Sequence, residues 1–306
     1  MNETRVRKLI VLMVNFNSVA FTADSIRSMR DQPVTEIHVL DNGSTIPQDP
    51  AFAALAEIDE RVRLHRSDEN LGFGGGVNRL VAETEGAPSD LLWILNPDTT
   101  VTGDAVAVLR AAAEEHPDAM LSPMILRPDG TIWYAGGSLD VRRGYSAHAH
   151  YNERPEVVGD QPFPTGFITG AAPVLSRATW DRVGPMREDL FLYWEDTEFS
   201  IRARGLGVPL LVVPQARIVH VEGGSSSGGH GRSDTYYYYF SRNRVLVCAP
   251  HAGLFSVVAG RGAVETARAL LKPVLREPEG KWKKSVGSIR GLVDGVRQYL
   301  KDWRRG

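Results

Sequence analysis

Two acidic motifs in the sequence have the residue types and positions needed for phosphate and proton chemistry. The first ends in Asp98, which follows Asn96 and Pro97 directly after the apolar run at residues 91–95. A carboxylate at the end of a buried strand is suited to hold a divalent cation that bridges two phosphates. The same residues also fit an Asx-Pro turn before a helix that begins near residue 102, and alone they do not separate these interpretations.

The second motif is the pair Glu195 and Asp196, with Glu198 nearby, at the start of a helix expected near residues 197–204. Acidic side chains are common in a first helical turn because they interact favourably with the helix dipole, and this explains Glu198 well. The pair adjoins three aromatic side chains, those of Phe191, Tyr193 and Trp194. An apolar shelf of this kind raises the pKa of a carboxylate toward the range of a general base.

A single histidine, His220, ends the apolar strand expected at residues 218–221. A lone histidine at a strand end is more often structural than functional. At the edge of a phosphate site, however, it becomes a candidate metal ligand.

Two further segments contain residues suited to a nucleotide. Asp41, followed by Asn42-Gly43-Ser44, can hydrogen-bond a base or ribose, although a turn with a glycine at positive φ explains this motif better when it is taken alone. Residues 70–78 form a glycine-rich loop that opens a helix and can cradle a phosphate or sugar. This loop follows the third expected strand and lacks dinucleotide-binding glycine spacing, and the sequence holds no GxxxxGK[ST] phosphate loop.

These segments need a parallel sheet to bring them together. Short apolar runs at residues 9–14, 37–40, 62–65 and 91–95 alternate with helical spacing at 19–29, 50–58 and 76–85. Such βα repeats predict a doubly wound, mainly parallel sheet whose ligands bind at the carboxyl ends of the strands. Further strands are expected at 119–126, 132–134, 172–175, 209–213 and 218–221, whereas residues 136–164 resist assignment. The glycine- and serine-rich run at 223–231 is expected to be a flexible connection.

The C-terminal part of the chain is expected to be helical, with breaks near Pro250, Pro273 and Pro278. Apolar residues in its last segment follow one helical face: Val286, Ile289, Leu292, Val293, Val296, Tyr299, Leu300 and Trp303. Basic residues occupy the other side, so residues 281–305 resemble an amphipathic helix that lies on an anionic membrane surface. Packing of this face on the rest of the protein, or a homodimer contact, explains the spacing equally well.

Composition restricts the class of protein. The 306 residues carry a net charge of −2, but residues 261–306 contain twelve Lys/Arg against five Asp/Glu, so a basic tail follows an acidic body. That distribution argues against a nucleic-acid binder. The single Cys248 excludes an internal disulfide framework and a thiolate zinc cluster. No apolar run is long enough to span a bilayer and the first residues do not resemble a signal peptide, so we expect a cytoplasmic protein, peripheral at the inner face of the plasma membrane.

The order and spacing of these motifs resemble family-2 glycosyltransferases of the GT-A fold, in particular the bacterial rhamnosyltransferase-like and galactofuranosyltransferase-like branch. The matching segments are Val14-Asn15-Phe16-Asn17, Asp41-Asn42-Gly43-Ser44, residues 70–78, Asn96-Pro97-Asp98, residues 194–202, and His220 with the Gly-Gly-Ser that follows. The resemblance implies a GT-A catalytic domain at residues 1–232, with a nucleotide-sugar half at about 1–118 and an acceptor half at about 119–232. Residues 233–306 would form a helical C-terminal extension.

The resemblance also implies roles for individual residues. The nucleotide would lie against Val14, Asn15 and Asp41, and its diphosphate on Mg²⁺ or Mn²⁺ held by Asp98 and His220. Other donor-side residues would be Asn17, Asn70, Gly72, Asn78 and Asn96. Asp196 would be the general base, with Glu195 beside it and Tyr193 and Trp194 on the acceptor side. Many members of the family carry Asp where Asn96 stands, and a neutral amide is a weaker metal ligand.

The reaction implied is direct displacement of a nucleoside diphosphate by an acceptor hydroxyl, with inversion at the sugar carbon. The branch favours dTDP-rhamnose as donor, ahead of UDP-galactofuranose and other UDP-sugars, and a polyprenyl-linked or other cell-envelope glycan as acceptor. Two other classes remain open. A sugar-phosphate nucleotidyltransferase would need a glycine-rich basic loop after the first strand, which this sequence lacks. A sugar-binding module without activity would not need Asp98, Asp196 and His220 together.

Overall fold

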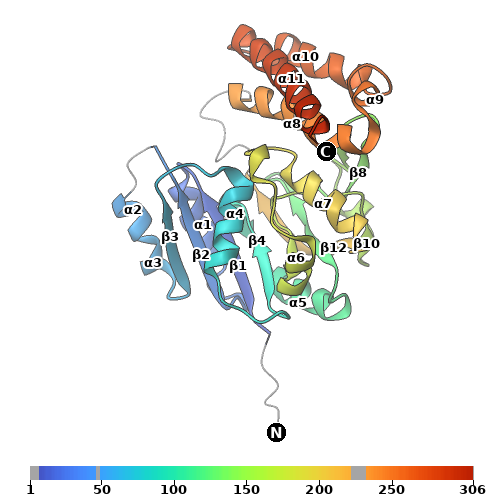
Figure 1. Cartoon of the computed structure of the whole chain (residues 1–306). Helices are drawn as coiled ribbons and strands as arrows, with labels where there is room; N and C mark the ends of the chain where they lie inside the picture. Colours follow the sequence, from blue (N-terminus) through green and yellow to red (C-terminus); the bar gives the residue numbers. More distant parts are fainter. Residues whose placement is uncertain (1–6, 46–48, 222–231, 306) are drawn as a thin grey trace.

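A mixed sheet with helices on both faces forms the centre of the molecule (Figure 1). The structure, a computed structural model, describes residues 7–45, 49–221 and 232–305. The sheet order is β10-β12-β6-β11-β4-β1-β2-β3, with β5 paired to β12 and β7 paired to β6. The strands of its first half are β1 (Leu9–Asn15), β2 (Glu36–Asn42), β3 (Val62–Ser67), β4 (Leu91–Ile94) and β5 (Thr99–Val101).

Strands β4, β1, β2 and β3 are parallel neighbours, which confirms the predicted doubly wound sheet. The first five residues of β1, Leu9 to Met13, are fully buried, as expected for a strand covered on both faces. The helices of this half are α1 (Val19–Ser28), α2 (Asp49–Ala53), α3 (Leu55–Ile58), α4 (Gly72–Glu83) and α5 (Ala105–Glu115). The parallel strands begin at the end of the molecule remote from the C-terminal helices, so their carboxyl ends face these helices (Figure 1).

The second half of the sheet differs from the sequence-based expectation in two places. Its elements are β6 (Met120–Leu126), β7 (Ile132–Tyr134), β8 (Gly137–Asp140), β9 (Tyr145–His148), η1 (Pro155–Val157), β10 (Phe163–Pro164), β11 (Val174–Ser176), α6 (Arg177–Val183), η2 (Glu188–Leu190), α7 (Glu195–Gly205) and β12 (Leu210–His220). The strands predicted at 209–213 and 218–221 are one strand, β12, which continues through a register irregularity between Val213 and Arg217. The unassigned stretch contains the β8–β9 hairpin.

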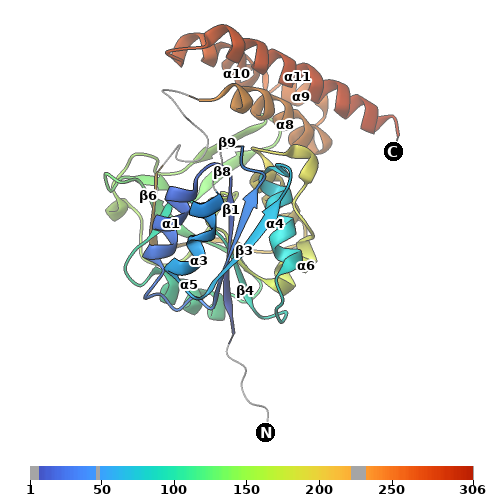
Figure 2. The same ribbon diagram turned by 90° about the vertical axis from the view of Figure 1, so that its left-hand side faces the viewer.

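Four helices follow the sheet: α8 (Asp234–Ala252), α9 (Leu254–Val258), α10 (Ala263–Arg276) and α11 (Lys281–Trp303). Pro250 and Pro273 themselves lie within α8 and α10, but α8 ends at Ala252 and α9 begins at Leu254, so the break predicted near Pro250 is present at Gly253. The chain also leaves helix between Arg276 and Lys281, close to the predicted breaks near Pro273 and Pro278. Figure 2 shows α8 between the sheet and the outer helices α10 and α11. The run at 223–231 lies outside the described residues. Among the residues described, no helix is long and apolar enough to cross a membrane.

Helix α11 packs on α8 through a face of small residues. A Cβ atom added at Gly291 would lie 2.1 Å from the carbonyl oxygen of Tyr238, and one added at Gly295 would lie 2.6 Å from that of Arg242. These glycines therefore allow the two helix backbones to approach closely. The predicted apolar stripe of α11 divides between two environments. Leu292, Val296 and Tyr299 pack toward the core around α8, whereas Ile289, Val293, Leu300 and Trp303 remain exposed.

Candidate active site

Asp98 and His220 meet at the carboxyl edge of the sheet, although 122 residues separate them. Nε2 of His220 donates a hydrogen bond of 3.0 Å to Oδ1 of Asp98, and the two residues are 3% and 6% exposed. Strand β12 pairs with β5, which places His220 directly beside Thr99. The backbone N–H of Val221 also donates to the Asp98 carbonyl oxygen. The predicted convergence of these two residues is therefore present.

The donor set at this edge fits a cation that the chain shares with a substrate. Within the described residues, no cluster of three or more His, Cys, Asp and Glu side chains forms a self-contained metal site. Mg²⁺ and related hard cations are commonly held by one or two carboxylates together with substrate phosphates and water. Asp98 supplies such a carboxylate. Nδ1 of His220 is buried and has no hydrogen-bond partner among the described residues, so this nitrogen is unused and could act as a metal ligand.

The acid pair, Glu195 and Asp196, begins α7 but occupies two different environments. Asp196 is only half-buried, and its Oδ2 accepts a hydrogen bond of 2.9 Å from the backbone N–H of Gly170. Its Oδ1 accepts from the backbone N–H and the hydroxyl of Thr197. Glu195 is 7% exposed, and its Oε2 has no partner in the part of the chain that the structure describes. Asp196 is thus the more accessible and better oriented carboxylate.

Burial changes the proton affinity of both carboxyl groups. Loss of solvent raises the pKa of Glu195 well above its usual range, and the neighbouring Asp196 raises it further. Burial also raises the pKa of Asp196, while the hydrogen bonds from Gly170 and Thr197 and the nearby His148 oppose this rise. The expected aromatic shelf is present in part, because Trp194 is buried and precedes the pair directly. Asp196 therefore has the raised proton affinity of a general base.

The aromatic loop, residues 191–194, directly precedes the acid pair and has a strained backbone conformation. Three non-glycine residues in it have positive φ: Phe191 at 64°, Tyr193 at 68° and Trp194 at 72°. The N–H of Leu192 donates to the carbonyl of Leu190, which closes a γ-turn of the rare kind with positive φ at its central residue. Positive φ at several bulky residues persists only when surrounding contacts enforce it.

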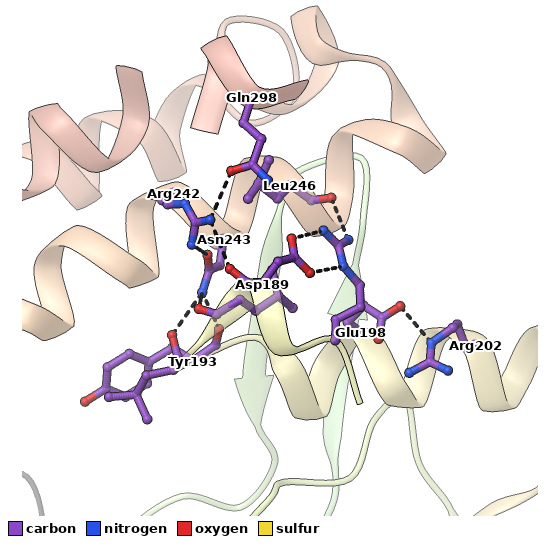
Figure 3. A network of polar contacts seen from close by, with 11 residues as sticks. Asp189, Tyr193, Glu198, Arg202, Arg242, Asn243, Leu246 and Gln298 are labelled. Carbon is purple, nitrogen blue, oxygen red and sulfur yellow. Dashed lines mark hydrogen bonds and ion pairs between the residues drawn. The ribbon is translucent and has the colours of Figure 1, made fainter. Parts of the chain in front are cut away.

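Asn243 of α8 supplies such contacts (Figure 3). Its side chain is fully buried, and Nδ2 lies 2.8, 2.9 and 2.8 Å from the carbonyl oxygens of Leu190, Leu192 and Tyr193, respectively. The next residue toward the N-terminus, Arg242, donates to the carbonyl of Asp189 and to the side chain of Gln298 on α11. The C-terminal helices therefore hold the loop that carries the acid pair.

The glycine-rich segment contributes to the same loop rather than forming an open cradle at its start. Gly72, Gly74, Gly75 and Gly76 lie inside α4 and are buried. A Cβ atom at Gly72 would lie 2.3 Å from the carbonyl oxygen of Phe191, which instead accepts the N–H of Phe73 at 2.8 Å. The N–H groups of Leu71 and Gly72 donate to Asn42 and Asn70. The first N–H groups of this helix thus have protein partners, and the expectation of a loop at residues 72–76 was wrong.

Other predicted donor-side residues lie at the ends of β1 and β2. Asn15 is buried, its Oδ1 accepts from Ser18 and Thr22, and its Nδ2 has no partner among the described residues. Asp41 accepts the N–H of Ser44, with Gly43 at φ 68°, so the predicted turn is present. Asn17, with φ 55°, bonds Thr45 and links the ends of the two strands.

Three more of the predicted donor-side positions are also located. Val14 packs against Gly76 of α4. Asn96 is partly exposed after β4, and its N–H donates to the carbonyl of Ala171. Asn78 bonds the main chain of Met186 and the carboxylate of Glu188, so it joins α4 to the segment before the aromatic loop. Direct contact of these residues with a donor stays a prediction.

A family model described as glycosyl transferase family 2 matches residues 10–171. The chain belongs to this family. This family 2 glycosyltransferase therefore uses a nucleotide-sugar donor and inverts configuration at the transferred sugar, and the GT-A fold expected from the motifs is confirmed.

Relatives of known activity are similar at low identity. N-acetylglucosaminyl-diphospho-decaprenol L-rhamnosyltransferase of Mycobacterium tuberculosis is 28% identical over 219 residues, which are 64% of this chain and 69% of that protein. The dTDP-rhamnosyl transferase RfbF of Shigella flexneri is 22% identical over 198 residues, covering 63% and 64%. Galactofuranosyltransferase GlfT2 of M. tuberculosis is 25% identical over 263 residues, covering 77% of this chain but 40% of its own length.

Solved structures share the fold of this glycosyltransferase. GalNAc-T7 with UDP, GalNAc and Mn²⁺ superimposes with a TM-score of 0.64 at 15% identity, over 96% of this chain and 56% of that one. The mannosyltransferase PcManGT of Pyrobaculum calidifontis, in complex with GDP-Man and Mn²⁺, gives a TM-score of 0.56 at 13% identity, over 98% and 88%. At these identities the similarity shows the fold alone.

Residues that the sequence analysis did not single out lie beside the candidate site residues. The ring of Trp133 on β7 lies edge-on to His220, with centroids 4.6 Å apart, and it also contacts His148 on β9 at 4.8 Å. Nδ1 of His148 donates to the Trp133 carbonyl. Trp133, His148 and Asn243 lie in segments without a recognisable motif, so only the fold brings them to the site.

Proposed function

We propose that this chain transfers L-rhamnose from dTDP-rhamnose to a hydroxyl group of a polyprenyl-diphosphate-linked glycan of the cell envelope. The proposal is supported by two rhamnosyltransferases among the relatives, one of which is named for a decaprenol-linked acceptor. The observation that carries the transferase chemistry is the pairing of Asp98 with His220 at the same sheet edge as a half-buried Asp196 with raised pKa.

Asp196 acts as the general base in this proposal. It accepts the proton of the acceptor hydroxyl while the oxygen forms a bond to the anomeric carbon and the bond from that carbon to the diphosphate breaks. The hydrogen bonds from Gly170 and Thr197 fix the carboxylate in one orientation. A correctly placed base contributes roughly 10²–10⁴ in rate. Tyr193 and Trp194, which precede the pair, lie on the acceptor side.

Asp98 and His220 would hold Mg²⁺ or Mn²⁺ against the donor diphosphate. A divalent cation bound there neutralises negative charge that develops on the leaving nucleoside diphosphate. Asn15 would bind the nucleoside, and this role is supported by its Nδ2, a buried donor without a partner among the described residues. Val14, Asn17, Asp41 and Asn96 complete the donor side, and Asn70, Gly72 and Asn78 act through the backbone segments that they hold.

A thermal-stability screen tests the donor class. The protein is heated with dTDP, UDP and GDP, each with Mn²⁺ or with EDTA, because a ligand that binds only the folded state raises Tm. We expect the largest increase with dTDP and Mn²⁺. Turnover of dTDP-rhamnose and UDP-galactofuranose is then compared with a short-chain polyprenyl-diphosphate N-acetylglucosamine acceptor. No stabilisation by any nucleoside diphosphate would contradict the proposed site.

A UDP-galactofuranose transferase is the second candidate. It is favoured by the galactofuranosyltransferase GlfT2, whose match covers a larger share of this chain than the rhamnosyltransferase matches do. Preference for UDP in the screen, followed by turnover of UDP-galactofuranose but not dTDP-rhamnose, would select this alternative without changing the roles of Asp98, Asp196 and His220.

A further inference from the structure

Large apolar side chains remain exposed along the outer sides of α10 and α11. In α10 the exposed set is Val264, Leu271, Val274 and Leu275, each at least 50% exposed. In α11 it is Trp282, Ile289, Val293, Leu300 and Trp303, with Trp282 at 80%. We refer to these nine residues as the outer face. Soluble proteins rarely leave so many large apolar side chains together in water, so this face needs an occupant.

The outer face points away from the rest of the protein on both helices. Helix α10 turns Thr266 toward Arg244 of α8, and Leu271 and Leu275 follow Thr266 by five and nine residues, which places them on the opposite side. Helix α11 turns Gly291 toward the backbone of α8, and Trp282 precedes it by nine residues. Figures 1 and 2 show both helices at the end of the molecule beyond α8.

Basic side chains flank the outer face. Those classed as exposed are Arg268, Arg276, Lys281, Lys283, Arg290, Arg297, Lys301, Arg304 and Arg305. Of the five acidic residues of this region, Glu265 and Glu277 are buried in ion pairs, Glu265 with Arg143 and Glu277 with Lys284. Asp294 is partly exposed beside Arg297, and Glu279 and Asp302 are exposed. The nine exposed basic residues therefore outnumber the two exposed acidic ones, and the exposed charge around the apolar residues is predominantly positive.

We propose that the outer face docks on the surface of an anionic lipid bilayer. Bulky apolar residues, including tryptophans at both ends of α11, would enter the headgroup region while the lysines and arginines contact lipid phosphates. A second copy of this chain fits less well, because a symmetric contact would bring the same positive flanks together. The charge of the face thus matches a negatively charged surface.

Docking in this orientation has a consequence for the active site. The carboxyl ends of the parallel strands face the C-terminal helices, so Asp98 and Asp196 would lie at the bilayer end of the molecule. The inference goes beyond the proposed transfer reaction and does not depend on the identity of the donor.

Vesicle co-sedimentation of the full chain tests the proposal. Vesicles of phosphatidylcholine containing one third phosphatidylglycerol are compared with pure phosphatidylcholine, at low and at high salt. We expect binding to the anionic vesicles at low salt and loss of most of it at high salt, because salt screens the attraction. Removal of α11 is unsuitable, since it would uncover the α8 surface that Gly291 and Gly295 contact. Point substitutions leave that α8 surface covered and are used instead.

Two variants that each lose three positive charges test whether the outer face is responsible for vesicle binding. Lys281→Gln/Arg290→Gln/Lys301→Gln removes three exposed charges from α11, and Arg27→Gln/Arg30→Gln/Arg63→Gln removes three from the sheet half of the molecule. Each basic residue near an anionic surface contributes about fivefold in binding, so the first variant should bind about 100-fold more weakly. The second should bind like the wild type. Leu271→Ser/Leu275→Ser should also weaken binding while leaving nucleotide-induced stabilisation intact.

Three outcomes would overturn the proposal. The wild type could remain unbound with anionic vesicles at low salt, or the two charge variants could bind equally well. Sedimentation could also reveal a dimer that Leu271→Ser/Leu275→Ser dissociates, in the absence of vesicle binding, which would make the outer face a contact between copies. The nucleotide screen on the same preparations reports the transferase site separately, so failure of one proposal is distinguishable from failure of the other.

Discussion

Replacement of Asn243 by alanine should reduce turnover although Asn243 belongs to a helix outside the sheet. The substitution removes the two N–H donors of the amide, which are shared among the carbonyl groups of Leu190, Leu192 and Tyr193. At about 1 kcal/mol for each donor, the loss is about 2 kcal/mol. The positive φ values of Phe191, Tyr193 and Trp194 each cost of the order of 1–3 kcal/mol.

The lost hydrogen bonds are therefore comparable in free energy to the strain at one of these residues, and the aromatic loop should relax in part toward ordinary φ values. Asp196 follows the loop by two residues, so its carboxylate would move. A displacement of about 1 Å at a reacting group can cost roughly 10² in rate. We expect kcat to fall by about this factor. The Kd of the nucleoside diphosphate should change little, because Asn15, Asp41 and Asp98 lie on other elements.

The assay combines steady-state turnover, nucleotide calorimetry and tryptophan fluorescence, which reports relaxation of the loop through Trp194, 4% exposed in the native structure. Ser241→Ala is the matched control, since Ser241 is a buried polar residue of the same helix but bonds Ser288 of α11 rather than the loop. It should lower stability by about 1 kcal/mol and leave kcat unchanged. Wild-type kcat in folded Asn243→Ala, or an equal loss of kcat in Ser241→Ala, would refute the reasoning.

Three further predictions concern the site itself. Asp196→Asn should lower kcat by roughly 10²–10⁴ with nucleotide affinity retained in calorimetry, and comparable turnover would transfer the role of base to Glu195. Asp98→Ala should weaken nucleotide binding far more in the presence of Mn²⁺ than in EDTA, and His220→Ala should have the same effect more mildly. If EDTA leaves nucleotide affinity unchanged in the wild type and in both variants, the metal site is excluded. The pKa of Glu195 is raised by folding, so the native state holds its proton more tightly than the unfolded state and loses stability as pH rises above the unfolded pKa. Glu195→Gln should therefore increase Tm relative to the wild type at pH 8, with a difference that shrinks toward acid pH, and calorimetric scans showing the opposite trend would contradict the raised pKa.

The convergence of Asp98 and His220 was predictable from the sequence because each follows an apolar strand. Parallel strands share one carboxyl edge, so residues that end such strands meet regardless of their separation along the chain. The same reasoning placed Asp41, whereas Asn15 was expected from the family resemblance. Reasoning from strand ends required only that the buried runs be recognised, and β1 and β4 are buried along nearly their whole length.

The conformation that presents Asp196 was not predictable in this way. Phe191, Tyr193 and Trp194 are bulky residues with no local preference for positive φ. Their conformation is imposed by contacts with Asn243, about 50 residues later in the chain, and by the approach of Phe191 to Gly72. Neither contact leaves a pattern of spacing in the sequence.

Glycine allows a close backbone approach in two places of the structure, and the sequence does not reveal what approaches in either. In α4, Gly72 admits the carbonyl of Phe191, and in α11, Gly291 and Gly295 admit the backbone of α8. As a sequence feature, the first suggested a cradle for phosphate or sugar, because glycine permits close approach without showing what approaches. Both sets of glycines affect the aromatic loop. Gly72 contacts the loop directly from α4. Gly291 and Gly295 let α11 pack closely on α8, and α8 holds the loop through Asn243. An added Cβ at Gly291 should therefore disturb the acid pair as well as the helix contact.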